Sequence, residues 1–415
     1  MPKFEPFRAI RYAPGTDYDA VIAPPYDVLS DADIDYYKAL DPHNIVWIDL
    51  PAGGDLSAPG QQVAAEADAY AQAASLLRQW LAAGVLVQDA TPSFTIYRMA
   101  FTDATGAARE IVGVLGGLEV VDEGAGGVLP HERTTPKAKS DRLDLTRATA
   151  TNLSPVWGLS LASGLTAALS APGEPLGSLE VAGVTHSVER VSDPQRIAEI
   201  AQILAADDVL IADGHHRYAV SRFYRDEVRA GSGRTDTEAE YTLTFVNELI
   251  DEQLSIEAIH RLYSGICLEH LRGVFAACFD FTPLHAELTG ETLAQMTRLG
   301  RLVFLHPDGT AEWMTPKDDA FDGVRALDGA YLEHALAPIA ADPHDSNLTV
   351  SYQHGLAEMR AAVASGAYTA GVLIRPTSIA EIKRTAREGL LMPPKSTFFT
   401  PKLRTGFVIR PTAAL

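Results

Sequence analysis

The sequence predicts an α+β protein in which mixed β-sheets are flanked by helices. Apolar residues make up 47% of the 415 residues and charged residues 21%, proportions typical of a globular protein with a full hydrophobic core. Segments with strand-like composition also alternate with segments of helical periodicity along the chain. Because the length exceeds what one hydrophobic core usually organises, we expect two or three packed subdomains.

The N-terminal part begins with short apolar pieces and a rigid turn at Pro24-Pro25-Tyr26-Asp27. Tandem prolines fix this turn because they lock φ and remove two amide donors. Ser30 and Asp31 are residues that commonly cap a helix. The predicted elements are a helix through residue 40, a strand at residues 45–50, an alanine-rich helix at residues 61–83, and paired strands at residues 94–101 and 109–121.

The rest of the chain alternates shorter elements after a glycine-rich stretch at residues 123–127, which predicts a domain boundary. Asp193 and Pro194 are suited to the cap and the first position of a helix. The predicted elements are a strand at residues 185–190, a helix at 193–206, a buried strand at 209–212, a helix at 218–229, strands at 241–248 and 254–261, a helix at 356–365, a strand at 370–374, a helix at 379–388 and a terminal strand at 406–410.

Charge and composition exclude several classes of protein. The formal net charge of −20 is spread along the chain and repels nucleic-acid backbones, so we expect no nucleic-acid partner and only a local basic pocket for anions. Two cysteines are too few for a metal cluster or a disulfide framework. The chain shows neither a secretory h-region nor an apolar stretch of about 18 residues, which predicts a cytoplasmic protein with no membrane partner. Its oligomeric state is left open, with a homodimer among the options.

The first candidate site follows the buried strand, where residues 211–218 read Ile-Ala-Asp-Gly-His-His-Arg-Tyr. Backbone N–H groups and the helix dipole at the start of a helix form an anion site, and a glycine there allows close approach of a ligand. A guanidinium offers a planar fork for phosphate oxygens. The alternative is a polar turn with solvated histidines. The candidate residues are Asp213, Gly214, His215, His216 and Arg217.

The second candidate site is the glycine-flanked loop from Leu129 to Lys139. A carboxylate, Glu132, lies between two basic residues, so it would stay ionised and could accept a proton or hold a metal. The alternative is a solvated charged loop followed by a helix at residues 141–150. The candidate residues of this loop are His131, Glu132, Arg133 and Lys137.

The third candidate site is the proline-bounded loop at residues 393–402, in which Lys395, Ser396 and Thr397 are donors suited to phosphate. The alternative is a plain C-terminal crossover loop. The chain contains no Walker A loop, no Gly-x-Ser-x-Gly, no Gly-x-Gly-x-x-Gly after a strand and no His-Glu-x-x-His. The usual hydrolase, dinucleotide-binding and zinc-protease motifs are therefore missing.

Five segments of the chain occur in an order that resembles a known family. They are Pro24-Pro25-Tyr26-Asp27, residues 129–137, Asn152-Leu153-Ser154-Pro155, residues 212–218 and residues 392–402. Together they resemble the bacterial and archaeal DUF family numbered one thousand and fifteen, a group of uncharacterised conserved proteins. The resemblance covers nearly the whole chain.

A shorter resemblance has implications for chemistry. Asp213-Gly214-His215-His216-Arg217 is similar to the phosphate-binding motif of the ParB/sulfiredoxin superfamily, most closely that of its free-serine kinases. This resemblance implies a ParB/sulfiredoxin-like core that binds ATP or ADP through His215, His216 and Arg217, with Asp213 near Mg²⁺. Those kinases use a glutamate as the base for the serine hydroxyl, and Glu132 is the candidate for that role here.

These observations define expected subdomains and a leading function. Residues 1–123 are expected to form an N-terminal α/β subdomain, residues 124–265 the phosphate- or nucleotide-binding core, and residues 266–415 a C-terminal α/β subdomain whose last loop returns to the site. The leading hypothesis is a small-molecule kinase that phosphorylates a hydroxyl, with free L-serine as the favoured acceptor. The alternatives are a phosphate-ester or nucleotide hydrolase and a non-catalytic nucleotide-sensing regulator. The expected catalytic residues are Glu132, His216 and Asp213, with Asp213 also the metal ligand; the expected nucleotide-binding residues are Gly214, His215, Arg217, His131, Arg133, Lys137, Lys395, Ser396 and Thr397.

Overall fold

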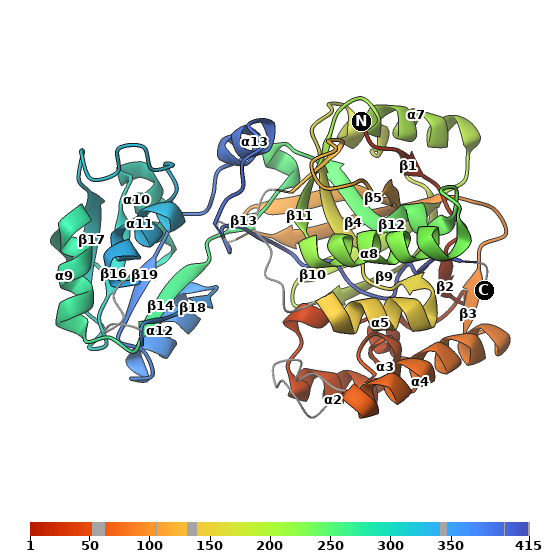
Figure 1. Cartoon of the computed structure of the whole chain (residues 1–415), viewed down its shortest axis with the longest axis horizontal. Coiled ribbons are helices and arrows are strands. Elements are labelled where there is room, and N and C mark those ends of the chain that lie inside the picture. The colour runs from red at the N-terminus through yellow and green to blue at the C-terminus, as the bar shows by residue number, and fades with distance from the viewer. Residues whose placement is uncertain (52–62, 104–105, 131–138, 341–346, 394, 414–415) are drawn as a thin grey trace. The chain divides into compact units, whose positions relative to one another are not determined.

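The computed structural model describes the whole chain except residues 52–62, 104–105, 131–138, 341–346, 394 and 414–415 (Figure 1). Contacts group the chain into two compact units, of which unit 1 comprises residues 1–254 and 401–415 and unit 2 comprises residues 255–400. The glycine-rich stretch at residues 123–127 therefore lies within unit 1, and the last residues of the chain return to that unit. Among the helices of the described residues, none has the length and apolar character needed to cross a bilayer.

The described part of unit 1 is organised around a nine-stranded mixed sheet. Along the sheet the strands are β6 (Val128–Leu129), β11 (Val209–Asp213), β8 (Val156–Ser160), β12 (Tyr241–Glu248), β5 (Ala108–Glu119), β4 (Phe94–Thr102), β10 (Val184–Val191) and β9 (Glu174–Val181), with β1 (Phe4–Glu5) paired to β5. The pairs β6–β11 and β8–β12 are parallel and the other pairs are antiparallel. Smaller pairs join β2 (Ile10–Tyr12) to β3 (Leu86–Gln88) and β7 (Thr151–Asn152) to β21 (Arg410–Pro411).

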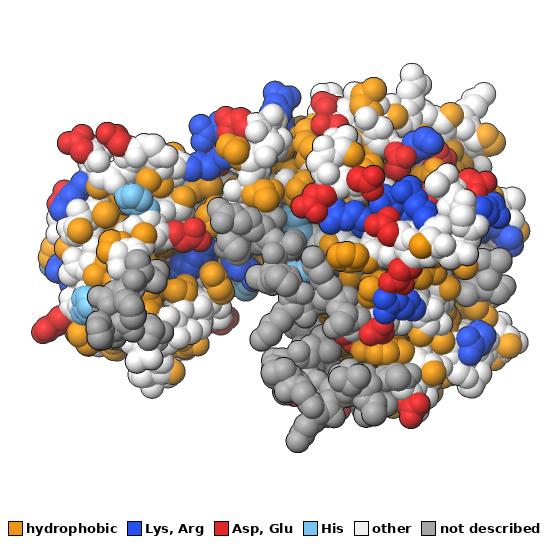
Figure 2. Space-filling view, viewed as in Figure 1, with side chains coloured by type: hydrophobic (Ala, Val, Ile, Leu, Met, Phe, Trp, Pro, Cys, Tyr) orange, Lys and Arg blue, Asp and Glu red, His pale blue; other side chains and the backbone are white. Residues whose placement is uncertain are grey.

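Helices cover this sheet in successive layers (Figure 1). Helix α8 (His215–Ser232) contacts β8 and β12, α5 (Lys139–Thr149) packs on α8, and α4 (Val63–Ala82) packs on α5. The other helices of unit 1 are α1 (Tyr18–Val21), α2 (Asp31–Leu40), α3 (Val46–Asp49), α6 (Leu165–Ala168) and α7 (Pro194–Leu204), with 3₁₀ turns at Tyr26–Val28, Glu238–Glu240 and Asp251–Gln253. Lys and Arg side chains interleave with Asp and Glu side chains over α8 (Figure 2).

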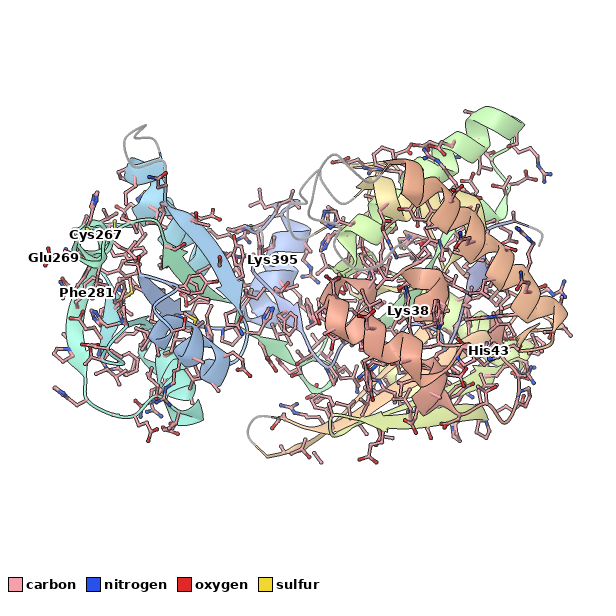
Figure 3. All side chains as sticks on the ribbon, turned by 90° about the horizontal axis from the view of Figure 1, so that it is seen from below. Lys38, His43, Cys267, Glu269, Phe281 and Lys395 are labelled. Carbon is pink, nitrogen blue, oxygen red and sulfur yellow. The ribbon has the colours of Figure 1, made fainter. Side chains whose placement is uncertain are left out.

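Unit 2 is built on its own six-stranded sheet. Its strands run in the order β15 (Phe279–Leu284), β17 (Ala311–Pro316), β16 (Leu302–Leu305), β19 (Ala370–Leu373), β14 (His260–Ser264) and β18 (Thr349–Gln353), and β13 (Ile256–Glu257) pairs separately with β20 (Phe398–Phe399). Its helices are α9 (Leu268–Cys278), α10 (Gly290–Leu299), α11 (Asp328–Ala340), α12 (Leu356–Ala364) and α13 (Ile379–Arg387). The two cysteines, Cys267 and Cys278, are free thiols (Cys267 is labelled in Figure 3).

Local capping explains why several helices begin where the sequence predicts. Ser30 and Asp33 form a reciprocal capping box at α2, since the Ser30 hydroxyl accepts from the Asp33 amide and the Asp33 carboxylate accepts from the Ser30 amide. At α7 the Asp193 side chain accepts a hydrogen bond from the amide of Arg196, and Pro194 occupies the first helical position. The predicted α+β class with mixed sheets is confirmed, whereas the ParB/sulfiredoxin-like core remains a prediction.

One predicted strand, at residues 45–50, is wrong, because Val46–Asp49 form helix α3. The side chain of Asn44 causes this outcome: its Oδ1 accepts from the Val46 amide at 3.1 Å and its Nδ2 donates to the Ala20 carbonyl at 2.7 Å. The Asp49 amide then donates to the Ile45 carbonyl at 2.9 Å, which closes a helical turn. A short apolar run of this kind is too brief for its periodicity to distinguish a strand from a helix.

Three other boundaries differ from the prediction. Helix α8 begins at His215 rather than at residue 218, because Gly214 already reverses the chain direction after β11. The strand predicted at residues 254–261 is divided between β13 and β14. The terminal strand predicted at residues 406–410 is reduced to Arg410–Pro411, which pair with β7.

Candidate functional site

The candidate site lies where strand β11 passes into helix α8. Val209, Leu210, Ile211 and Ala212 are buried, so the strand is held in the core of the sheet up to Asp213. Gly214 has φ +85° and forms the N-terminal cap of α8 without any side chain. The first amides of an α-helix have no acceptor within the helix, so the start of α8 presents N–H donors and the positive end of its dipole.

Gly214 also makes room for the side chain of Arg217. A Cβ atom built at Gly214 would lie 3.0 Å from both Cζ and Nε of Arg217, so the guanidinium folds back against the glycine backbone. Glycine is therefore required here for two reasons: the left-handed backbone and the close approach of an arginine side chain.

The largely buried Arg217 is the centre of an ion cluster in unit 1. Its Nη2 lies 2.8 Å from Oδ2 of Asp213 and 3.7 Å from Oδ2 of Asp27, and its Nη1 donates to the carbonyl of Pro155. Nζ of Lys402 lies 3.3 Å from Oδ1 of Asp213. The terminal nitrogens of Arg217 are thus engaged by protein groups, and among the described residues its buried Nε has no hydrogen-bond partner.

The pKa values in this cluster follow from burial and from neighbouring charges. Burial by itself would raise the pKa of Asp213, but Lys402 and Arg217 outweigh it and hold the pKa of that carboxyl well below its usual range. Burial would lower the pKa of Arg217, but Asp213 and Asp27 outweigh it and raise that pKa. Asp213 is therefore a carboxylate and Arg217 a guanidinium at neutral pH.

The second sequence motif follows strand β6, which is the neighbour of strand β11 in the sheet. Strand β6 runs parallel to β11, with Leu129 paired to Leu210, so both chains approach the same edge of the sheet. Pro130 follows β6, and the predicted residues His131, Glu132, Arg133 and Lys137 lie outside the described residues.

A pocket in unit 1 adjoins the start of α8. It encloses about 430 Å³, part of which is open to solvent. Arg217 contributes to both features, because it belongs to the first turn of α8 and also lines the pocket. The lining residues come from the 24–28 turn, α3, α5, the 151–154 segment, α8 and β12: Tyr26, Asp49, Arg142, Leu145, Thr146, Thr151, Asn152, Leu153, Ser154, Arg217, Val220, Ser221 and Thr242.

Arg142 and Asp49 form a buried ion pair on the pocket wall. Nη1 of Arg142 lies 3.0 Å from Oδ1 of Asp49, its Nε lies 2.7 Å from Oδ2 of Asp141, and its Cζ lies 4.3 Å from the centroid of the Tyr26 ring. Burial raises the pKa of Asp49 in spite of Arg142, and burial raises the pKa of Tyr26 to about 12. The Ser154 hydroxyl is 2.7 Å from the hydroxyl of Thr405 and 3.5 Å from Asp49.

Sequence reasoning did not include Asp49 in the site, and it included Arg142 only in the continuation of the second motif, without a role. Asp49 is the one charged residue in an apolar run, but that run was interpreted as a strand. A solvated helix was one of the two interpretations left open for the segment that contains Arg142, whereas only 7% of the surface of Arg142 is exposed. The tandem-proline turn was the sequence feature that could have indicated this part of the pocket. Tyr26 belongs to that turn, and its ring stacks on Arg142.

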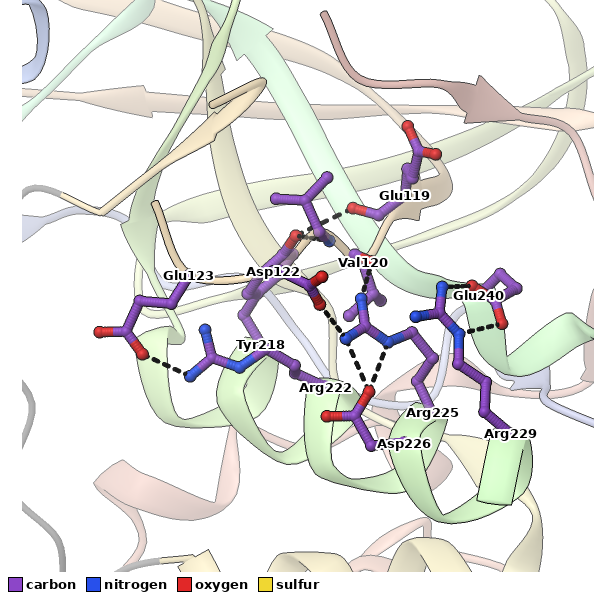
Figure 4. Close-up of polar contacts among 11 residues, drawn as sticks. Glu119, Val120, Asp122, Glu123, Tyr218, Arg222, Arg225, Asp226, Arg229 and Glu240 are labelled. Atoms are coloured by element: carbon purple, nitrogen blue, oxygen red, sulfur yellow. Dashed lines mark hydrogen bonds and ion pairs between the residues drawn. The ribbon is translucent and has the colours of Figure 1, made fainter. Parts of the chain in front are cut away.

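Helix α8 is anchored along its length to the segment that follows β5 (Figure 4). The Tyr218 hydroxyl donates to the carbonyl of Glu119 at 2.9 Å and accepts from the amide of Val121 at 2.8 Å. Two turns further along, the buried Arg225 donates to the Val120 carbonyl and pairs with Asp122. These contacts fix the direction in which the start of α8 points.

Residues 393–400 of the third motif belong to unit 2, whereas Pro401 and Lys402 belong to unit 1 (Lys395 is labelled in Figure 3). Lys395 has φ +60°, and its carbonyl accepts from Nη2 of Arg261 at 3.1 Å. The Ser396 carbonyl accepts from the Thr377 hydroxyl at 2.9 Å, and Ser396 and Thr397 are largely buried. Lys402, at the end of this motif, lies beside Asp213, and the convergence of Lys395, Ser396 and Thr397 on the α8 site remains a prediction.

The described side chains around Asp213 were compared with the requirements of a metal site. Within the described ranges no three His, Cys, Asp or Glu residues are grouped so that they could hold a metal ion. Both oxygens of Asp213, the predicted ligand, are already in contact with cations. A metal ion held only by described protein groups does not fit this arrangement.

Comparison with known proteins identifies the family. The model of the family described as "Protein of unknown function (DUF1015)" matches residues 4–330, and the chain belongs to this family. No curated protein matches the chain.

Several solved structures are distantly similar. They include a conserved hypothetical protein from Pyrococcus furiosus (TM-score 0.38, 11% identity, covering 68% of this chain and 92% of that one). A free serine kinase in complex with AMP has a TM-score of 0.37 and 10% identity, covering 68% of this chain and 89% of that one. SbnI with a C-terminal truncation, from Staphylococcus aureus, has a TM-score of 0.33 and 14% identity, covering 71% and 87%. Scores this low do not establish a shared fold.

Proposed function

We propose that this member of the DUF1015 family is a small-molecule kinase that transfers a phosphoryl group from a nucleotide to a hydroxyl, with free L-serine as the favoured acceptor. The observation that carries the proposal is the start of α8, where Gly214, Asp213, Arg217 and Lys402 surround a helix N-terminus at the end of a buried strand. Phosphoryl transfer depends mainly on positioning and charge neutralisation, and this edge of the sheet offers fixed donors for both.

The nucleotide phosphates would lie against the first turn of α8, on the amides of His215 and His216. Helix N-termini with a preceding glycine are common phosphate sites because both the amides and the dipole favour an anion. Lys402 would contribute a cation from the C-terminal segment, since its ammonium already lies 3.3 Å from Asp213 at this edge. Lys395, Ser396 and Thr397 would add donors from their own loop.

Glu132 would accept the proton of the acceptor hydroxyl as the phosphoryl group is transferred. The parallel pairing of β6 and β11 supports this role, because Glu132 follows Leu129 by three residues and Leu129 pairs with Leu210. His131, Arg133 and Lys137 would neutralise charge from the same loop, and His216 would assist proton transfer from α8.

Mg²⁺ would enter with the nucleotide rather than occupy a protein site. Mg²⁺ is commonly held by one or two carboxylates together with substrate phosphates and water. Asp213 would supply the one protein oxygen, after the phosphates had drawn Lys402 or Arg217 away from it. The ion would neutralise charge on the transferring group.

The direct test follows phosphorus in a mixture of purified protein, Mg²⁺, ATP or ADP, and L-serine within a pool of hydroxylated metabolites. Phosphorus NMR should show a new phosphomonoester. Glu132→Gln should reduce its formation roughly 10²- to 10⁴-fold, the range typical of a lost general base. Glu123→Gln is the matched control, because this carboxylate is exposed and pairs only at the surface with Arg222.

The other outcomes separate the alternative functions. Orthophosphate without a phosphomonoester would make the protein a hydrolase. Tight nucleotide binding without turnover would make it a nucleotide-sensing regulator. Equal activity of the Glu132→Gln and Glu123→Gln variants would remove Glu132 from the mechanism.

A further inference from the structure

Unit 2 contains a pocket of its own. It encloses about 730 Å³, part of which is open to solvent. Its walls come from the end of α10, the start of α11, the segment that follows β19 and the start of α13, all of which belong to residues 255–400. Ser396 of the third sequence motif also lines the pocket, but its hydroxyl already donates to the carbonyl of Pro393 at 2.7 Å. Recognition of a ligand here therefore depends on the other lining residues.

Arg375 gives this pocket a hydrogen-bond donor. Its Nε lies 3.0 Å from Oδ2 of Asp328, and its Nη2 contacts Oδ1 of the same carboxylate. The third guanidinium nitrogen, Nη1, makes no hydrogen bond to a described residue and is accessible, and 26% of the side chain is exposed. A Cβ atom built at Gly300 would lie 3.6 Å from Nη1, which places Nη1 at the end of α10, the helix that contributes Thr297 to the pocket wall. A guanidinium only donates, so a ligand at Nη1 must bring an acceptor.

Two further donors border the same pocket. The amide of Gly329 lies in the first turn of α11, where N–H groups have no acceptor within the helix. Ser378 caps α13: its oxygen accepts from the Glu381 amide at 3.2 Å, which leaves the hydroxyl hydrogen for a ligand. A guanidinium, an amide and a hydroxyl from three separate elements therefore border one pocket.

Cations outnumber carboxylates around this pocket. Arg261 lines it, and its guanidinium donates to the carbonyls of Ile259 and Lys395. The other charged groups that line the pocket, or that pair with a lining residue, are linked in ion pairs. Among the described residues the cations of this set are Arg261, Arg325, Arg375 and Arg384, and the carboxylates are Asp328, Glu381 and Glu388. An anion would therefore meet a wall with an excess of positive charge.

We infer that this pocket of unit 2 binds a phosphate group, either inorganic phosphate or the phosphate of a small phosphomonoester. A phosphate carries acceptor oxygens that point in several directions, which suits donors from three elements better than the two coplanar oxygens of a carboxylate. Its charge matches the excess of cations, and the Gly329 amide adds a donor of the kind that phosphates use at the start of a helix. The recognising residues are Arg375, Gly329 and Ser378, and binding there does not depend on the transfer reaction proposed above.

Amide NMR of the full chain labelled with [¹⁵N]glycine locates the binding event directly. The resonance of Gly329 is identified by its loss in Gly329→Ala. Titration with inorganic phosphate and with glycerol 3-phosphate at low ionic strength should shift this resonance, whereas glycerol, which has no phosphate, should not. The resonances of Gly309 and Gly366, whose surroundings in unit 2 are open, should stay in place as internal controls. The tighter of the two phosphate ligands identifies the source of the phosphate group.

A pair of variants at Thr297 tests the charge of the pocket. Thr297 is exposed at the pocket wall, so its replacement does not disturb the core. Thr297→Glu places a negative charge there and should weaken phosphate binding about fivefold or more, whereas Thr297→Gln, of the same shape but neutral, should bind as the parent protein does. Arg375→Lys is a second variant: it keeps a cation beside Asp328, removes Nη1 and should weaken binding about tenfold. Arg298→Lys, at an exposed arginine of α10, is its control.

The outcomes separate this site from the proposed kinase. A Gly329 resonance that neither phosphate ligand moves, or equal affinities in Thr297→Glu and Thr297→Gln together with an unchanged affinity in Arg375→Lys, would overturn the phosphate site even if the protein phosphorylates a hydroxyl. A Gly329 shift that depends on Thr297 and Arg375, in a protein that transfers no phosphate, would support the phosphate site and overturn the kinase.

Discussion

Replacement of Gly214 by alanine tests whether the close approach of Arg217 organises the site. The added methyl group has two separate costs. An alanine held at φ +85° loses about 1 to 2 kcal/mol relative to glycine. Its Cβ would also lie 3.0 Å from Cζ and Nε of Arg217, so the guanidinium must shift away from Asp213. Weakening that charge-assisted contact adds about 1 to 2 kcal/mol, giving about 2 to 4 kcal/mol for Gly214→Ala.

The other end of the same helix supplies a matched control. Gly233, the C-terminal cap of α8, has φ +69°, and a Cβ built there meets nothing within 4 Å. Gly233→Ala therefore carries only the backbone cost of about 1 to 2 kcal/mol. The difference between the two variants isolates the contact with Arg217.

Urea unfolding measures these costs if the signal comes from unit 1. Three of the four tryptophans belong to unit 1, and Trp313 belongs to unit 2. A Trp313→Phe background therefore restricts tryptophan fluorescence to unit 1. ADP titration of the same proteins should show weaker binding for Gly214→Ala and unchanged binding for Gly233→Ala. Equal losses of stability in the two variants, together with unchanged ADP affinity, would refute the argument that the packing of Arg217 against Gly214 organises the site.

Two further predictions concern the framework of unit 1. His186 is buried and its Nδ1 lies 2.7 Å from the Tyr97 hydroxyl; burial, aided by Arg404, lowers its pKa to about 3. The unfolded chain therefore binds a proton that the folded chain excludes, so the free energy of unfolding should rise between about pH 3 and 6.5 by up to about 5 kcal/mol. His186→Gln should flatten that rise in urea titrations across pH. Tyr218→Phe loses the two hydrogen bonds of its hydroxyl to the backbone of Glu119 and Val121, which should lower the free energy of unfolding by about 1 to 3 kcal/mol. Tyr224→Phe on the same helix should change it by close to nothing. Similar losses in both variants would show that the anchor is unimportant.

Much of the fold could be predicted because local physics determined it. The capping residues Ser30 and Asp193 mark helix starts with their own side chains, so the sequence shows them directly. Residues 45–50 could not be assigned in this way. The side chain of Asn44 closes that helical turn by reaching Ala20, a contact between distant residues that no local pattern records.

A candidate site could be proposed from the sequence where its residues are adjacent, whereas residues from distant segments could not be grouped. Residues 213–217 form one turn, so their chemistry is visible in the sequence as a single motif. Asp49, Arg142 and Tyr26 come from three separate elements, and only the packing of α5 on α8 and the pairing of Arg142 with Asp49 bring them to one pocket. The sequence also does not show burial. Arg142 lies in a polar helix, but in the structure it is buried, pairs with Asp49 and lines the pocket.

The charge balance of the ion cluster changes how the arginine in the motif should be understood. Asp213 and Asp27 face Arg217 and Lys402, so the cluster holds two carboxylates and two cations and offers a phosphate no net positive charge. Attraction for a nucleotide must then come from the amides of α8 and from the basic residues that follow β6. Arg217 instead keeps Asp213 ionised and packs its guanidinium against the backbone of Gly214.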